Sequence, residues 1–292
     1  MSASVVHPAA LSFDIEDWFH PELVRGRVGA DERRSVVEEG TRAILAALAR
    51  QHARATFFVL GDVARRHPGL VTEIAAAGHE LACHGMTHRP LWALERESFR
   101  AELRAFRAAI RAVLGQDPVT GFRAPTFSLD RTTAWALDVL REEGFAWDSS
   151  VFPMRVGLYG VGGAPLGIYR PSSADPARED PAGALLEFPV TVEALGPWRI
   201  PVAGGFYLRA LPLAMLTAAL DRVARRRPLA LYLHPWECVR DLPRAPLPPR
   251  DAFITYVGLA GVRAKLERLI ARYACDTMSA ILERHGRPAT AA

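Results

Sequence analysis

The sequence predicts an α/β fold that is built on a parallel sheet and forms a single domain of barrel size. Short apolar segments alternate with longer segments of helical periodicity along most of the chain, a pattern that is typical of a parallel sheet flanked by helices. The 292 residues suit one α/β barrel, a fold that commonly fills about 250 residues. No internal repeat and no shift in composition indicates a second domain.

The first half of the chain contains five predicted strands and four predicted helices. The strands are short runs of apolar or β-branched residues at 9–13, 55–60, 79–83, 119–122 and 145–147. The helices show apolar residues three or four positions apart, at 35–51, 68–77, 95–114 and 130–143. Pro68 begins one helix and Gly78 ends it, which is the usual placement of these two residue types.

The second half of the chain is less regular. Residues 149–184 are rich in Gly, Pro and Ser and are too long for a simple connection, so we expect a functional loop there. A strand, a helix and a further strand then complete the predicted sheet, at 184–192, 213–226 and 228–233.

The C-terminal part of the chain is predicted to be helical. After a proline-rich segment at 243–249, two helices are expected at 251–272 and 276–285. We therefore predict a barrel domain over residues 1–240 and a helical extension, packed on the barrel, over residues 241–292.

The composition argues against several classes of protein. Half of the residues are hydrophobic, 23% are charged and the formal net charge is +4, as in ordinary globular proteins. The arginines are scattered and the longest basic run is 225–227, so no nucleic-acid partner is expected. Cys83, Cys238 and Cys275 are odd in number and far apart, which suits neither a disulfide framework nor a structural zinc site.

The predicted location follows from what the sequence lacks. The first residues show no charged region followed by a long apolar stretch, so no signal peptide is predicted. No apolar run reaches the roughly 18 residues that a membrane-spanning helix needs. We therefore expect a cytoplasmic protein without a membrane span.

Ionisable residues follow five of the predicted strands. The residue after each strand is listed here in chain order: Asp14, His84, Arg123, Asp148 and His234. The carboxyl ends of parallel strands carry the active site in α/β barrels and in open α/β sheets. These five side chains are therefore expected to meet at one end of the barrel.

A metal site is predicted from two histidines and a group of acids. His84 and His88 lie four positions apart in a loop, and two imidazoles at this spacing can bind one zinc ion or another divalent metal. The third ligand is expected to be a carboxylate from Asp14, Glu16 or Asp17, which cluster on one short segment. A second acid of this group can then act as a base toward a water molecule.

Three further residues are predicted to support the reaction. Arg123 can orient an acid because a guanidinium group matches a carboxylate. His234 can donate a proton to a leaving group. Asp148 can hold His234, as carboxylates behind catalytic or ligating histidines do.

The ordered motifs resemble those of the polysaccharide deacetylase superfamily, carbohydrate esterase family 4. The matching segments are SFDIED, HGMTH, FRAPTF, WDSS and LYLH, which span residues 12–234 in the order that the family shows. The resemblance implies a distorted (β/α) barrel of seven or eight strands that usually holds zinc. It also implies a hydrolase that removes N-acetyl groups.

The resemblance assigns a base and a set of metal ligands. Asp14 matches the catalytic base, and His84 and His88 match the two metal-binding histidines. The common first motif has two adjacent aspartates, whereas Ile15 follows Asp14 here. A subgroup with a D-x-D/E motif takes its ligand two residues after the base, which selects Glu16 and leaves residue 17 as the alternative.

The other assigned positions surround the reacting group. Arg123 matches the arginine that positions the base, and a backbone N–H at Phe127 matches the position that stabilises the oxyanion. Asp148 matches the acid that supports the last histidine. His234 matches the general acid, and Leu233 matches a residue that lines the acetyl pocket.

A finer resemblance connects the chain to the exosortase-associated deacetylases, which are encoded with exopolysaccharide clusters. The segments that carry it lie at 200–209, 234–237 and 255–270. It implies an N-acetylated saccharide as substrate and exopolysaccharide-biosynthesis enzymes as partners. Phe206, Tyr207 and Arg209 are expected to contact the substrate.

The predicted function is removal of N-acetyl groups from an amino sugar in a polysaccharide or its precursor. An allantoinase-like amidohydrolase acting on a small cyclic amide or formamide is the first alternative, because the same site residues suit it. A non-catalytic sugar-binding barrel is the second. That alternative predicts loss of a site residue, yet Asp14, His84, His88 and His234 are all present.

Overall fold

The computed structural model describes residues 7–286. Its main sheet has eight strands, and every neighbouring pair in it is parallel. The strands are β1 (Ala9–Ile15), β2 (Thr56–Val59), β3 (Glu80–Cys83), β4 (Gly121–Phe122), β5 (Trp147–Asp148), β6 (Leu186–Glu187), β9 (Leu229–Leu233) and β10 (Cys275–Asp276). The predicted α/β class and the barrel-like curvature are confirmed.

The sheet is curled but incompletely closed. Strand β1 pairs with β2, β9 and β10, and from β2 the sheet runs through β3, β4 and β5 to β6. Thr191 connects the two ends: its N–H donates to the carbonyl oxygen of Ala230 at 3.0 Å, and its Oγ1 accepts from the N–H of Ala230 at 2.7 Å. A side chain therefore bridges the gap where a regular barrel has a further strand pair.

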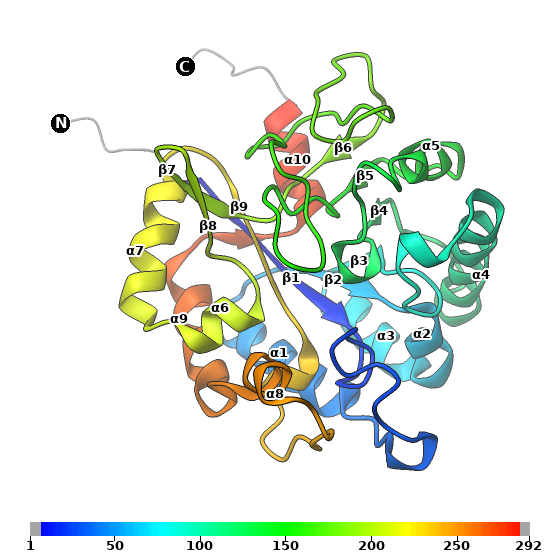
Figure 1. Cartoon of the computed structure of the whole chain (residues 1–292). Helices are drawn as coiled ribbons and strands as arrows, with labels where there is room; N and C mark the ends of the chain where they lie inside the picture. The colour runs from blue at the N-terminus through cyan, green and yellow to red at the C-terminus, as the bar shows by residue number, and fades with distance from the viewer. Residues whose placement is uncertain (1–6, 287–292) are drawn as a thin grey trace.

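The described residues form ten α-helices, most of which cover the outside of this sheet (Figure 1). They are α1 (Val37–Arg50), α2 (Gly61–Arg66), α3 (Pro68–Ala76), α4 (Arg96–Leu114), α5 (Trp135–Glu142), α6 (Gly205–Ala210), α7 (Leu213–Ala224), α8 (Pro249–Tyr256), α9 (Val262–Arg272) and α10 (Met278–Gly286). Within the described part of the chain, none of them is long and apolar enough to cross a membrane.

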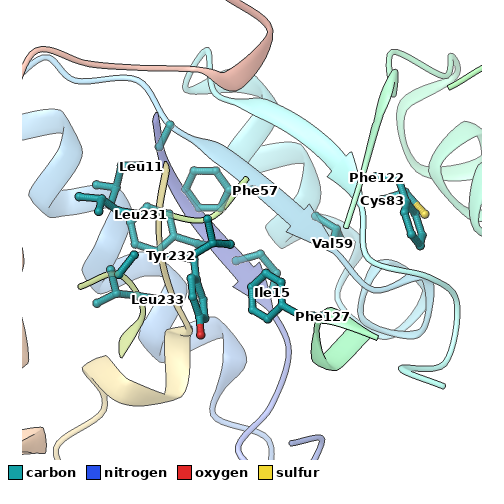
Figure 2. Packing of buried hydrophobic residues seen from close by; sticks show 14 of the residues in the cluster. Leu11, Ile15, Phe57, Val59, Cys83, Phe122, Phe127, Leu231, Tyr232 and Leu233 are labelled. Carbon is teal, nitrogen blue, oxygen red and sulfur yellow. The ribbon is translucent and has the colours of Figure 1, made fainter. Parts of the chain in front are cut away.

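Side chains alternate between the two faces of each strand, so the sheet has an outer face and an inner face. Both faces are packed with apolar residues. Residues of the outer face pack against the helices, and Leu11 is paired in register with Leu231 there. Figure 2 shows part of this packing, including Phe57 of β2. The residues that face the barrel interior form a separate cluster.

Helix α10 fills this interior at the amino ends of the strands. Met278, Ile281 and Leu282 pack with Trp147 and Phe58 from the strands. The indole Nε1 of Trp147 also donates to the hydroxyl of Ser279 at 2.9 Å, which connects α10 to strand β5.

The division of the chain at residue 240 stays a prediction. The structure adds that β10 pairs with residues 9 and 10 of β1 and that α10 packs inside the barrel. Residues beyond 241 therefore contribute to the barrel core as well as to its outside. The outermost parts of the two predicted segments, residues 1–6 and 287–292, lie outside the described residues.

Two predicted elements differ in the structure. The predicted strand at 184–192 is shorter, because β6 ends at Glu187 and the chain continues into an antiparallel hairpin of β7 (Val192–Leu195) and β8 (Trp198–Pro201). The predicted helix at 251–272 is divided into α8 and α9. Gly258 has φ +68° at the break, and a Cβ atom there would lie 2.4 Å from the carbonyl oxygen of Arg209. The chain therefore turns at this glycine. The helical periodicity on both sides of it led to the prediction of one continuous helix.

Candidate active site

A cavity of about 170 Å³ opens at the carboxyl ends of the strands. Six of the residues predicted to act in catalysis, metal binding or oxyanion stabilisation line it: Asp14, Glu16, His84, His88, Phe127 and His234. The expectation that residues far apart in sequence meet at this end of the barrel agrees with their placement.

Strand β1 brings two acids to the same side of the sheet. Side chains two positions apart on a strand point the same way, and Asp14 and Glu16 both lie at the cavity with 2% of their surface exposed. The D-x-E spacing thus presents two carboxylates to one cavity, whereas adjacent residues on an extended strand point to opposite faces.

Glu16, His84 and His88 form a cluster suited to a metal ion. One donor atom from each lies within 4.8 Å of the others. The Nε2 atom of His88 is 2.5 Å from Oε2 of Glu16, and Nε2 of His84 is 3.9 Å from the same oxygen. Two imidazoles and one carboxylate are a ligand set of catalytic zinc sites.

The hydrogen bonds around this cluster fit a bound cation. Oε2 of Glu16 is buried, and in the described chain Nε2 of His88 approaches it to 2.5 Å without the geometry of a hydrogen bond. Nδ1 of His84 lies 2.9 Å from the carbonyl oxygen of Arg123. That oxygen only accepts, so Nδ1 carries the proton and the lone pair on Nε2 faces the cluster.

The pKa shifts agree with neutral ligating imidazole and ionised carboxylate. Burial lowers the pKa of His84 to about 4, so its imidazole is neutral near pH 7. Burial acts to raise the pKa of Glu16, but His88, His234 and His84 outweigh this and lower it below the ordinary value.

Asp17, the alternative ligand, has another task. Its Oδ1 accepts from the backbone N–H of Val36 at 2.7 Å, and its Oδ2 accepts from the hydroxyl of Ser35 at 2.6 Å. The carboxylate therefore connects the loop after β1 to the start of α1. Of the two acids that the D-x-E motif left open, the geometry favours Glu16.

Arg123 is buried and is held in one orientation. Its Nη1 donates to Oδ1 of Asp14 at 2.7 Å and to the hydroxyl of Ser12 at 2.9 Å. Its Nε and Nη2 donate to the carbonyl and hydroxyl oxygens of Ser149 at 3.1 and 2.9 Å. The guanidinium group also stacks on Phe58, with 3.9 Å between Cζ and the ring centroid. Its contact with Asp14 is through a single oxygen.

His234 lies across the cavity from the metal cluster. Its Nε2 is 3.5 Å from Oε1 of Glu16 and 4.0 Å from Oδ2 of Asp14. Its Nδ1 lies 3.2 Å from Oε2 of Glu237. Burial acts to lower the pKa of His234, but the hydrogen bond with Glu237 and the nearby acids raise it to about 9.

The predicted support of His234 by Asp148 is wrong. Trp147 packs in the barrel interior, so its neighbour Asp148 points to the opposite face of the strand. There it lies beside its register partner Glu187, and its Oδ1 accepts from the hydroxyl of Ser150 at 2.5 Å. The order of residues in the motif did not reveal which face of the strand the acid occupies.

The buried pair of Asp148 and Glu187 predicts a pH-dependent stability. Burial raises the pKa of Asp148 to about 6, and burial together with Asp148 raises the pKa of Glu187 well above 4.5. The folded chain therefore binds more protons than the unfolded chain above the ordinary carboxyl pKa values. The free energy of unfolding should fall as pH rises through this window.

A Glu187→Gln variant should remove part of this slope, because its amide stays neutral and can donate to Asp148. We expect the variant to gain about 1 kcal/mol over the wild type as the pH rises from the ordinary carboxyl pKa of about 4 past the Asp148 pKa of about 6. Urea unfolding across this pH range measures the difference, with the exposed Glu179→Gln as control. Parallel pH profiles for wild type and Glu187→Gln would contradict the raised pKa values of this pair.

The predicted oxyanion donor at Phe127 needs correction. Its backbone N–H already donates to the carbonyl oxygen of Ala124 at 3.0 Å. The preceding residue, Thr126, lines the cavity, and its buried Oγ1 has no hydrogen-bond partner among residues 7–286. Thr126, Phe127 and His88 have φ of 58°, 49° and 58°, which places backbone strain at the site.

Three residues predicted to contact the substrate are placed elsewhere. Leu233 packs in the core on the face of β9 opposite to His234. Arg209 borders the cavity, but its side chain is buried and hydrogen-bonded to Glu237 and to backbone carbonyls. Tyr207 is not among the cavity-lining residues of the described chain, whereas Phe206 is.

Sequence reasoning missed several cavity residues that the fold supplies. They are Tyr232, Trp236, Glu237, Tyr159 and Leu158. For Glu237 the signal was available, since a glutamate three residues after a potential helix N-cap commonly accepts from the cap backbone. The other four come from loops or from a strand whose inward face was not assigned.

The fold and the site together define a class: an α/β barrel with a buried carboxylate–histidine cluster whose donor atoms could hold a metal ion. Residues 9–145 match the family described as Polysaccharide deacetylase, and residues 149–283 match a domain of unknown function, DUF3473. The predicted resemblance to the polysaccharide deacetylase superfamily is thereby supported.

Curated relatives match part of the chain. A chitooligosaccharide deacetylase from Rhizobium leguminosarum bv. trifolii is 40% identical over 100 residues, which cover 34% of this chain and 43% of the relative. A chitooligosaccharide deacetylase from Sinorhizobium fredii is 38% identical over 85 residues, which cover 29% of this chain and 40% of the relative. The matches thus span less than half of these relatives.

Solved structures agree with the fold over nearly the whole chain. A candidate polysaccharide deacetylase from Mycobacterium smegmatis has a TM-score of 0.63 at 22% identity, covering 97% of this chain and 91% of the other. An allantoinase has a TM-score of 0.61 at 14% identity, covering 99% and 94%. At these identities the similarity shows the fold alone.

Proposed function

We propose that this protein is a metal-dependent polysaccharide deacetylase that removes N-acetyl groups from an amino sugar. The observation that carries the proposal is the cluster of Glu16, His84 and His88, with the carboxylate of Asp14 beside it in the same cavity. The family match over residues 9–145 and the chitooligosaccharide deacetylase relatives support the reaction type.

The proposal divides the polar residues between metal binding and proton transfer. Glu16, His84 and His88 would hold zinc or another divalent cation, which would supply Lewis-acid polarisation of the acyl group. Asp14 accepts a proton from the attacking water, and its hydrogen bond with Arg123 fixes the position of the carboxylate.

The other side of the cavity serves the leaving group. Nε2 of His234 faces the acids, and a pKa of about 9 keeps the imidazole protonated near pH 7. His234 therefore donates a proton to the sugar nitrogen as the C–N bond breaks, and acetate and a free amine leave. Thr126 is the candidate donor toward the acyl oxygen, since its buried hydroxyl lacks a partner in the described chain.

The substrate is proposed to be an N-acetylated saccharide of exopolysaccharide biosynthesis. The DUF3473 match covers residues 149–283, which include the three segments that carry the resemblance to exosortase-associated deacetylases. On this proposal the enzymes that build the same polysaccharide are its functional partners.

Acetate release tests this function. Purified protein is loaded with zinc and incubated with N-acetylhexosamine oligomers in one series and with hydantoin-type cyclic amides in another. We expect acetate and free amine from the oligomers and no opening of the cyclic amides. The reverse result would favour an allantoinase-like activity, and no turnover in either series would favour a non-catalytic barrel.

A further inference from the structure

A buried ion pair lies directly behind His234. The Nε atom of Arg209 donates to Oε1 of Glu237 at 2.6 Å, and the two side chains are 3% and 1% exposed. Burying such a pair costs free energy unless every charge finds good partners. This pair lies next to the His234 imidazole, so its effect on that ring can offset the cost of burying it.

The second oxygen of Glu237 is committed to His234. Oε2 accepts from the backbone N–H of His234 at 2.9 Å and lies 3.2 Å from its Nδ1. Pro235 follows His234 and begins a short 3-10 helix, Pro235–Cys238, with His234 as its N-cap. The i, i+3 geometry thus attaches the carboxylate to both the backbone and the ring of the same residue.

This attachment decides which ring nitrogen faces the reaction. A carboxylate accepts a proton from Nδ1, so the ring is fixed with Nε2 toward Asp14 and Glu16. The proton available for the leaving amine is therefore the one on Nε2.

Arg209 connects Glu237 to the C-terminal part of the chain. Its Nη1 donates to the carbonyl oxygens of Thr255 and Val257 at 3.0 and 2.9 Å, and its Nη2 donates to that of Ile254 at 2.9 Å. Together with the bond to Glu237, the Arg209 guanidinium group donates four hydrogen bonds within the protein.

Two glycines allow this packing. A Cβ atom at Gly205 would lie 1.9 Å from Oε2 of Glu237, and one at Gly258 would lie 2.4 Å from the carbonyl oxygen of Arg209. The start of helix α6 therefore lies close against the Glu237 carboxylate, and the turn after α8 lies close against the backbone of Arg209.

We propose that Glu237 and Arg209 are positioning residues for the general acid His234. Glu237 keeps the Nδ1 proton in place and directs Nε2 into the cavity. Arg209 holds Glu237 and makes residues 254–258 a structural part of the active site. The inference rests on the proposed deacetylase function and adds to it the residues that orient the proton donor.

Steady-state kinetics of zinc-loaded protein with an N-acetylhexosamine oligomer give the first test. We expect Glu237→Gln and Arg209→Lys to lower kcat by about 10- to 100-fold, with KM and zinc content near the wild-type values. Glu237→Ala and Arg209→Met should lose more, since the conservative variants keep one hydrogen bond each.

A matched control separates positioning from general stability. Arg222 forms a similar ion pair with the buried carboxylate of Glu193, away from the cavity. Arg222→Met should lower the melting temperature but leave kcat unchanged. An equal loss of kcat in Arg222→Met and Arg209→Met would overturn the proposal.

Nitrogen-15 NMR of histidine-labelled protein gives a readout that does not need turnover. The wild type should show a protected Nδ1–H signal from His234, assigned by its absence in His234→Ala. Glu237→Ala should lose this signal and Arg222→Met should keep it. An unchanged signal in Glu237→Ala overturns the proposal whatever the kinetics show.

The two readouts distinguish the failure of each claim. A wild type that releases no acetate while showing the Glu237-dependent signal refutes the deacetylase function and leaves the hydrogen-bond assignment standing. An active wild type whose Glu237 and Arg209 variants match it in kcat refutes the positioning role alone.

Discussion

Replacing Asp14 by asparagine should abolish turnover while the protein keeps its metal. The asparagine oxygen can still accept from Nη1 of Arg123, so the packing of the site changes little. The amide cannot take a proton from water, however, and general bases contribute about 10²- to 10⁴-fold to rate. We expect kcat to fall by about 10³-fold.

Acetate release and metal analysis of the same sample measure this result. Asp138→Asn is a suitable control, since Asp138 pairs with Arg96 at 3.5 Å on the surface of α5. An Asp14→Asn enzyme that turns over at the wild-type rate would show that the base lies elsewhere. A variant that also loses its metal would make Asp14 a ligand.

Replacing His84 by alanine should remove the metal and, with it, the activity. The variant lacks one of the three proposed protein ligands. Loss of a residue that only supports a ligand lowers metal affinity by up to about 100-fold, so we expect loss of the ligand itself to lower it by more than about 100-fold. Titration with zinc and elemental analysis after dialysis measure the loss.

The fold of this variant must be checked, since His84 also donates to the carbonyl oxygen of Arg123. His84→Asn is the second variant, because its amide can keep a hydrogen bond of this kind. His52→Asn is the control: His52 is exposed, and asparagine tolerates its φ of 49°. Full zinc retention by both His84 variants would refute the assigned ligand set.

The parallel sheet, and the end of it at which the polar residues gather, could be predicted from the sequence. Alternating apolar and amphipathic segments predicted the parallel sheet, and polar residues after Phe13, Cys83 and Leu233 marked one end of it. These inferences succeed because parallel strands joined by helices all place their carboxyl ends at the same edge.

Two of the errors, at Asp148 and Leu233, share one physical origin, which is the twofold alternation of side chains on a strand. Asp148 and Leu233 follow or end apolar runs in the expected motifs, yet both point away from the cavity. A strand two to five residues long that is apolar on both faces gives no sequence signal for which face is inside.

The sequence by itself determined the α/β class, the pair of histidines and the D-x-E acids, because these depend on residue type and short spacing. Only the tertiary structure brings Glu237, held by Arg209, beside His234, leaves the Thr126 hydroxyl without a partner among residues 7–286, and places α10 in the barrel interior. Arg209 and its contacts at 254–257 lie more than forty residues apart in sequence. Contacts at that distance depend on how loops fold over the barrel, which local spacing does not encode.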